Sequence, residues 1–464
     1  MSSALPAAVL AVLAIAASGL GLAAPLRGGL RVAAALLLGL GAWSASYAAT
    51  LLLFGSGAGV LLAKDAALAV AGTLLWRFGE RRSPARAEEV NAPAQPALRP
   101  EGRGPRPSFS QPPRWLWLFF AAACALVTAA VVEHTLRFPD GGYDAWMIWN
   151  TRARFLLRAA DFHTAFSPRL LFWLHQDYPW LLPGAVAQAF LLGRTESLAV
   201  PAVLSLLFAG LALSVLTLAV ARLRGLTWGL FAGLALATTP CFATFSSNQQ
   251  SDLPLSAFLA LCAALLAISQ EEGRDDLLVL AGFAAGLGAW TKNEGLLYVG
   301  CIGAALLWRE RKLRPVALFA AGTAPLLALL VGFKLGLRPP NDFVLFTTPQ
   351  ALVARALSPG RWGELLLLVL RRIVYFQDFA LWVLAELLLL VLVLRKLPGS
   401  VMGTALLLAC AAYAPIYVLQ PHPVEWIYRT SVDRIFIQLW PAAILATVLP
   451  LATATARARA TART

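Results

Sequence analysis

Apolar runs long enough to cross a lipid bilayer constrain this chain more than any other feature. Leu5–Ala24 and Gly399–Leu419 are two of them, and roughly 20 helical residues cross a hydrocarbon core of about 30 Å. Of 464 residues, 59% are apolar and 13% are charged, whereas soluble domains are about 25% charged. This composition excludes a set of soluble domains, a disordered chain and a disulfide-stapled scaffold. It predicts an all-α polytopic membrane protein.

Hydropathy divides the chain into about thirteen transmembrane helices. Two further apolar stretches do not fit as spans: Pro179–Gly193 is short and interrupted by proline, and Gly363–Phe376 carries Arg371 and Arg372. We expect both to be juxtamembrane or re-entrant amphipathic helices on the external face. The expected spans are 5–25, 30–53, 57–76, 115–134, 198–220, 226–243, 253–269, 277–290, 295–308, 315–337, 379–395, 400–418 and 435–454.

The positive charge marks the cytoplasmic side of this topology. The net charge is +14, and much of it lies in 77–114 and in the tail after Leu451, next to apolar spans. The positive-inside rule explains this placement better than a nucleic-acid surface, which would need aromatic or groove-matching elements beside the charge. The N-terminus is then external and the C-terminus cytoplasmic. The five cysteines show no CxxC spacing, so disulfides and zinc sites are not expected.

Three regions follow from this topology. Residues 1–76 form a three-helix membrane unit, 77–114 a basic linker with eight prolines that we expect to be disordered in the cytoplasm, and 115–464 the main transmembrane core. The polar segments that face outward are 135–178, 244–252, 291–295, 338–362 and 419–434. They hold most ionisable residues that do not mark topology, so chemistry is expected at the external boundary.

The external loop 135–178 contains the first candidate group. Gly141 and Gly142 permit a turn, after which Asp144 can cap a helix running to about Ala160. The simple interpretation is an N-cap followed by an aromatic belt. The alternative is a carboxylate held at headgroup level with cations nearby. Candidates from this helix and its approach are Asp140, Asp144, Trp149 and Arg154.

Further candidates come from four other places along the chain. His175, Asp177 and Tyr178 precede a rigid re-entry into the membrane marked by Pro179 and Pro183. Lys292 and Glu294 lie between two short apolar runs that predict a helical hairpin. Asp252 lies at the start of one expected span, and Arg434 lies just before the last one. Lys292 and Glu294 can simply pair as a polar turn, and Arg434 can snorkel or bind a phosphate. The positive-inside rule, however, does not explain a lysine on the external side. An acidic residue at the edge of a membrane span is energetically costly, so Asp252 is a functional candidate.

Such a set suits transfer of a sugar from a polyprenyl phosphate. The phosphate leaves as a stabilised anion, so the transition state needs cations at that phosphate and a base for the incoming hydroxyl. Glycoside hydrolases use two carboxylates because their leaving group is an alkoxide. One aspartate together with arginine and lysine would be enough here.

Several segments together resemble bacterial membrane glycosyltransferases of the GT-C superfamily, the relatives of protein O-mannosyltransferases and of the aminoarabinose transferase that modifies lipid A. They are GYDAWMIWNTRARFL (142–156), HQDYPWLLP (175–183), SDLPL (251–255), AWTKNEGLL (289–297) and TSVDRIFIQLWP (430–441). The resemblance covers about 115–455. It implies that Asp144 is the catalytic base and that Lys292 and Arg434 contact the donor phosphate, and we place Arg154 with them.

The same resemblance implies an inverting hexosyl- or pentosyltransferase in the bacterial inner membrane, with its active site on the external side. Its partners would be a polyprenyl-phosphate-linked sugar and a lipid, glycan or protein acceptor. Many members carry two adjacent acids in the first loop, whereas Asp140 and Asp144 are separated here, so Asp140 or Asp177 is the expected partner of Asp144. The remaining substrate-binding candidates are Trp149, His175, Tyr178, Asp252 and Glu294.

No cofactor is expected, although a divalent ion held by Asp144, Asp177 and Asp252 stays open. A transporter or lipid flippase is one alternative; it predicts internal repeats and midplane charges. The chain shows no repeat and few such charges, namely Lys64, Asp65 and Glu386. A glycan ligase that uses a diphosphate-linked donor is the other alternative.

Overall fold

The computed structural model describes residues 4–81, 111–158, 161–170, 174–374 and 399–461. Every regular element in these ranges is helical, which confirms the all-α prediction. The elements are α1 (Ala4–Leu22), α2 (Gly28–Phe54), α3 (Ala58–Arg81), α5 (Arg114–Arg137), η1 (Ala145–Asn150), α6 (Thr151–Arg158), η2 (Phe162–Phe166), α7 (Leu181–Gly193), α8 (Ala199–Arg224), α9 (Leu226–Ala237), α10 (Pro240–Ser247), α11 (Asp252–Glu272), α12 (Asp276–Thr291), α13 (Asn293–Glu310), α14 (Leu313–Leu337), α15 (Asp342–Leu345), α16 (Pro349–Ala356), α17 (Pro359–Val374), α19 (Val401–Leu419) and α20 (Val424–Thr461).

Eight helices in the described ranges are long and apolar enough to cross a membrane, or nine if α9 and α10, bent by 68° at their break, form one span. Shorter apolar helices, α12 among them, accompany these spans. A helix or bent helix pair covers every expected span except 379–395, which lies outside the described residues. The chain is thus a multi-pass membrane protein, and the count of thirteen stays a prediction.

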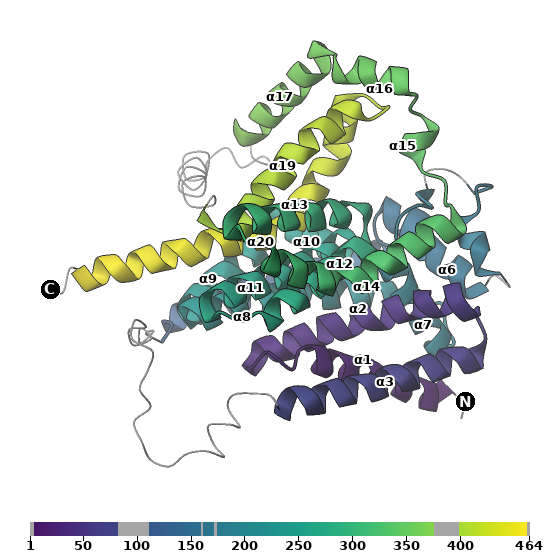
Figure 1. Ribbon diagram of the computed structural model, residues 1–464, viewed down its shortest axis with the longest axis horizontal. Helices are drawn as coiled ribbons and strands as arrows, with labels where there is room; N and C mark the ends of the chain where they lie inside the picture. The colour runs from purple at the N-terminus through teal and green to yellow at the C-terminus, as the bar shows by residue number, and fades with distance from the viewer. Residues whose placement is uncertain (1–3, 82–110, 159–160, 171–173, 375–398, 462–464) are drawn as a thin grey trace.

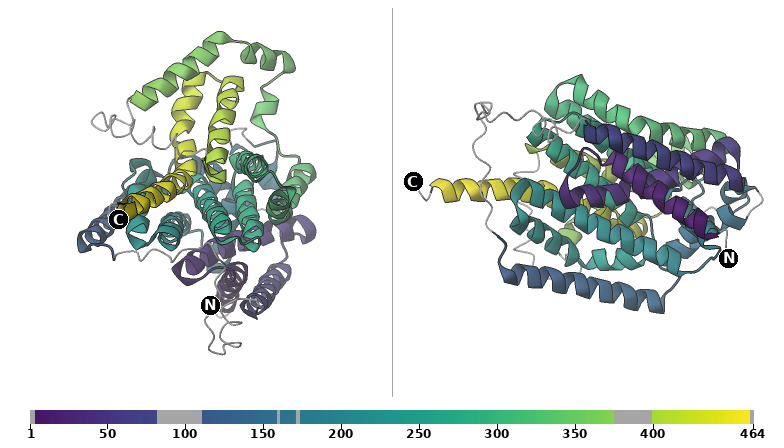
Figure 2. Two further views of the ribbon diagram at one scale, coloured as in Figure 1. Left: turned by 60° about the vertical axis from the view of Figure 1, so that its left-hand side comes forward. Right: turned by 90° about the horizontal axis from the view of Figure 1, so that it is seen from below.

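Most of the long helices run side by side along the long axis of the molecule, with α11 at the centre, while α17 and α19 rise away from this bundle (Figures 1 and 2). Of the residues in the most apolar 18-residue stretch of α11, 94% are buried, and α11 packs on α8, α12 and α20. Small residues such as Ala257, Ala260 and Ala264 allow these neighbours to approach closely. The start of α11 therefore lies where the helical core reaches one end of the bundle. We call this the site end; α6 lies toward it, and α20 projects beyond the opposite end (Figure 1).

The first three helices pack together and against α7. The Ser44 hydroxyl of α2 donates a hydrogen bond of 2.5 Å to the Leu181 carbonyl, in the first turn of α7. The Lys64 ammonium of α3 donates to the Gln188 side chain of α7 at 2.6 Å. Helix α3 continues to Arg81, beyond the expected unit 1–76. Most of the expected linker, residues 82–110, lies outside the described residues.

The two stretches not expected to span are both short helices. α7 has 13 residues, most of them buried. α17 has 16 residues, with Leu366, Leu367 and Leu370 exposed and Leu365 buried. Neither α7 nor the described part of α17 is among the helices long and apolar enough to cross a membrane. Residues 375 and 376, the end of the second stretch, lie outside the described ranges.

The last expected external segment, 419–434, is mostly helical rather than a loop. Only residues 420–423 separate α19 from α20, which begins at Val424. Pro421 and Pro423 end the connection, and no glycine or proline interrupts the chain from there to Pro441. Polar side chains marked this segment as external, but they do not stop a helix. Arg434 consequently lies on a continuous helix.

Candidate active site

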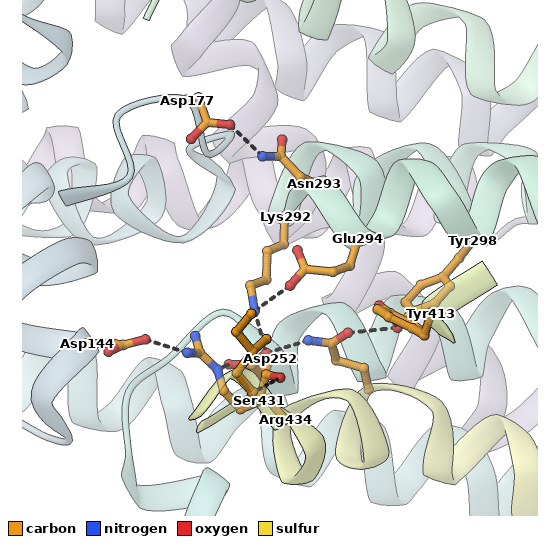
Figure 3. Close-up of polar contacts among 12 residues, drawn as sticks. Asp144, Asp177, Asp252, Lys292, Asn293, Glu294, Tyr298, Tyr413, Ser431 and Arg434 are labelled. Carbon is orange, nitrogen blue, oxygen red and sulfur yellow. Dashed lines mark hydrogen bonds and ion pairs between the residues drawn. The ribbon is translucent and has the colours of Figure 1, made fainter. Parts of the chain in front are cut away.

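Asp252, the first residue of α11, is the centre of a buried ionic cluster at the site end (Figure 3). Its side chain is fully buried and accepts a hydrogen bond from Lys292 Nζ at 2.8 Å. Arg434 Nε lies 3.2 Å from the other carboxylate oxygen. Gln438 Nε2 donates to the first oxygen at 2.5 Å. The cluster thus joins α11, the corner between α12 and α13, and α20.

The corner that carries Lys292 is closed too tightly for a side chain at Gly295. Lys292 has extended backbone angles, φ −158° and ψ 153°, between the two helices. A Cβ atom at Gly295 would lie 2.1 Å from the carbonyl oxygen of Gly288. Lys292 Nζ also lies 2.9 Å from Glu294 Oε1. The expected hairpin and the Lys292–Glu294 pair are both present, and Lys292 contacts Asp252 in addition.

Arg434 connects the buried part of the cluster to Asp144. Arg434 Nη1 lies 2.7 Å from Asp144 Oδ2, and each of the two side chains is 21% exposed. The prediction that Asp144 caps a helix is wrong. Asp144 precedes a π-helical turn, η1, and its side chain makes no capping hydrogen bond. The carboxylate turns toward a cation instead, as the alternative interpretation predicted (Figure 3).

Three aromatic rings from residues 149–178 stack beside this cluster. The Trp149 and Tyr178 ring centroids are 5.6 Å apart, and those of Tyr178 and His175 are 4.9 Å apart. Lys292 Nζ lies 5.8 Å from the Tyr178 ring. Burial raises the pKa of the Tyr178 hydroxyl well above its ordinary value, so it stays neutral. Trp149 is fully buried, so it is not part of an exposed aromatic belt.

Asp177 lies apart from the ionic cluster, above it in Figure 3. Asn293 Nδ2 and Asn341 Nδ2 donate to its Oδ2 atom at 2.7 and 2.6 Å. Lys334 Nζ lies 3.4 Å from the same oxygen. Asp177 thereby connects three segments of the site end. Among the contacts of the described residues, Asp144 pairs with Arg434, and which acid accompanies it, Asp140 or Asp177, stays a prediction.

Of the three arginines of α6, Arg154 was expected at the donor phosphate and Arg152 was not a candidate. Arg154 pairs with Glu196 at 3.6 Å rather than with the cluster. Arg152 is buried and donates to the carbonyls of Tyr178, Leu174 and His175 at 3.1, 2.7 and 2.6 Å. Burial lowers the pKa of Arg152 to about 10, so the guanidinium stays charged at neutral pH. Sequence reasoning missed Arg152 because nothing local distinguishes it from Arg154.

A buried hydrogen-bond chain extends from Asp252 away from Asp144. The Tyr298 hydroxyl donates to Gln438 Oε1 at 2.8 Å and lies 2.8 Å from the Tyr413 hydroxyl. None of these residues was a sequence candidate. Gln438 could have been found, because it lies four residues after Arg434 and thus on the same face of a helix.

Within the described ranges, no three His, Cys, Asp or Glu side chains gather as metal ligands would. Asp144 and Asp252 share Arg434, while Asp177 binds amides and a lysine elsewhere. A divalent ion on these three aspartates would require them to move together. The arrangement present instead pairs these carboxylates with two cations, Lys292 and Arg434.

The fold and this cluster define a polytopic helical membrane protein with an ionic site at one end of its bundle. Residues 179–333 match the family model described as dolichyl-phosphate-mannose-protein mannosyltransferase. The matched stretch runs from the re-entry into α14 and contains Asp252, Lys292 and Glu294, while Asp144 and Arg434 lie outside it. The match bears out the resemblance to GT-C membrane glycosyltransferases over that part of the chain. No curated protein and no solved structure matches the chain.

Proposed function

We propose that this protein transfers a sugar from a polyprenyl-phosphate donor to an acceptor hydroxyl at the external face of the membrane, with inversion. The observation that carries the proposal is the contact of Arg434 with both Asp144 and Asp252, beside Lys292. It places one accessible carboxylate next to two cations at the end of an apolar bundle. The family match supports the same class of donor.

In this proposal Arg434 and Lys292 stabilise the phosphate as it leaves. Cations fixed before the reaction stabilise developing negative charge without reorganising. Asp252 is a positioning residue, because its buried carboxylate contacts both cations. Asp144 accepts the proton of the acceptor hydroxyl as that oxygen attacks the anomeric carbon, and the bond between that carbon and the phosphate oxygen breaks. A single displacement of this kind inverts the configuration.

The experiment is a turnover assay with a polyprenyl-phosphate sugar in lipid nanodiscs. Asp144→Asn should lower turnover by at least about 100-fold, the usual contribution of a general base, while the lipid donor still binds. Asp161→Asn is the matched control, since Asp161 lies in the same external segment and contacts His163 rather than the cluster. Near-normal turnover of Asp144→Asn would overturn the assignment. Turnover with a diphosphate-linked donor alone would favour a ligase instead.

A further inference from the structure

Arg434 is held by two carboxylates that differ in how firmly they are fixed. Asp252 is fully buried and also accepts from Lys292 and Gln438. Asp144 is partly exposed, and Arg434 is its ionic partner among the described residues. Losing Asp252 from Arg434 would leave an inadequately paired charge in the interior, which is costly. Losing Asp144 would return a carboxylate to water, which costs little.

Both cations of the cluster already contact carboxylates. Lys292 contacts Asp252 and Glu294, and Arg434 contacts Asp252 and Asp144. Three acids therefore face two bases, which leaves the cluster with one more negative charge than positive. A phosphodiester that approaches this cluster adds further negative charge. It can bind Arg434 closely only by replacing one of the carboxylates already there.

We propose that Asp144 and the donor phosphate compete for Arg434, so that donor binding releases Asp144. This inference rests on the proposed function. The exchange is ionic and makes or breaks no covalent bond: the phosphate takes the Nη1 side of Arg434, while Asp252 keeps the Nε side. Until the donor is bound, the Asp144 carboxylate is engaged with a cation rather than with an acceptor hydroxyl. Donor binding therefore precedes activation of that hydroxyl.

The test measures binding of a polyprenyl phosphate without sugar to the full chain in nanodiscs. Asp144→Asn removes the competitor and should tighten binding about two- to fivefold, the value of a partly exposed ion pair. Asp161→Asn removes the same charge from the same external segment and should bind as the wild type does. In an Arg434→Gln background, Asp144→Asn should no longer tighten binding, because the shared cation is gone.

Each other outcome overturns the exchange. Unchanged or weaker binding by Asp144→Asn contradicts competition, and loss of turnover in that variant would leave the proposed function standing. An equal gain in the Arg434→Gln background indicates simple charge repulsion between Asp144 and the phosphate. The comparison of Asp144→Asn with Asp161→Asn does not depend on the folding of the Arg434 variant. If the wild type shows no saturable binding, the donor class fails together with the exchange.

Discussion

Asp252 and Lys292 form an ion pair of 2.8 Å whose side chains are 0% and 2% exposed. The two residues are 40 positions apart in the chain, at the start of α11 and at the corner between α12 and α13. Burial of both charges is favourable only because each has further partners. The pair therefore connects the stability of the core to the geometry of the site.

Lys292→Met should destabilise the protein by about 3 kcal/mol, because it leaves the Asp252 carboxylate buried with less positive charge around it. Replacing both residues, with Lys292→Met and Asp252→Asn together, should recover part of that loss, since no unpaired carboxylate remains at the start of α11 and the amide oxygen can still accept from Arg434. Equilibrium unfolding in mixed micelles measures both. A double variant as unstable as the single one would argue against this account.

Gly295→Ala should disrupt the corner that positions Lys292. The added Cβ would lie 2.1 Å from the Gly288 carbonyl oxygen, so the two helices must separate, at a cost of about 2 kcal/mol or more. Gly300→Ala is the matched control in the same helix, because nothing lies within 4 Å of a Cβ there. It should be neutral or slightly stabilising. Equal thermal midpoints for the two variants would refute the close approach.

Asp177→Ala should lower the stability of the protein at the site end without changing the contacts of the ionic cluster. The amides of Asn293 and Asn341 would lose their acceptor, at a cost of about 2 kcal/mol, while Lys334 would keep the Asp177 carbonyl and Asn293 Oδ1. Asp275→Ala removes an exposed pair with Arg314 and should change stability by less than about 0.5 kcal/mol. Unfolding measurements compare the two. The idea fails if Asp177→Ala is as stable as the control.

Arg152→Met should release the backbone of residues 174–178, because one guanidinium holds three of its carbonyls. Hydrogen exchange of the Tyr178 amide, which donates to the His175 carbonyl at 2.9 Å, should become at least about tenfold faster. Arg154→Met changes the neighbouring arginine that pairs with Glu196. It should leave this exchange rate unchanged, and a similar increase in both variants would contradict the assignment.

The helices of the bundle could be predicted from the sequence because their lengths follow from bilayer thickness. The hairpin at Lys292 and the start of α11 at Asp252 lie where hydropathy places them. The beginning of α20 could not be predicted from the sequence. Polar side chains indicate that a residue lies near water, but they do not indicate whether its backbone is helical. Trp149 likewise has the same sequence signal in a buried stack as in an exposed belt.

The sequence predicted which residues belong to the candidate site, but not which of their side chains contact one another across the helices. Asp144, Asp252, Lys292 and Arg434 were each expected, and the structure brings all four together. Their contacts depend on how α11, α13 and α20 pack, which no local pattern encodes. For the same reason Asp177 and Arg154 were placed with substrate, whereas the structure gives them asparagine and glutamate partners.

Helix α7 is too short to cross a membrane, and the first three helices supply the surface on which it lies. The Leu181 carbonyl and the Gln188 side chain of α7 find their partners on α2 and α3. A chain shortened to begin after residue 76 would lose the Ser44 and Lys64 side chains that contact α7. The N-terminal helices therefore support α7, and we expect a chain trimmed of them to pack this short helix less firmly.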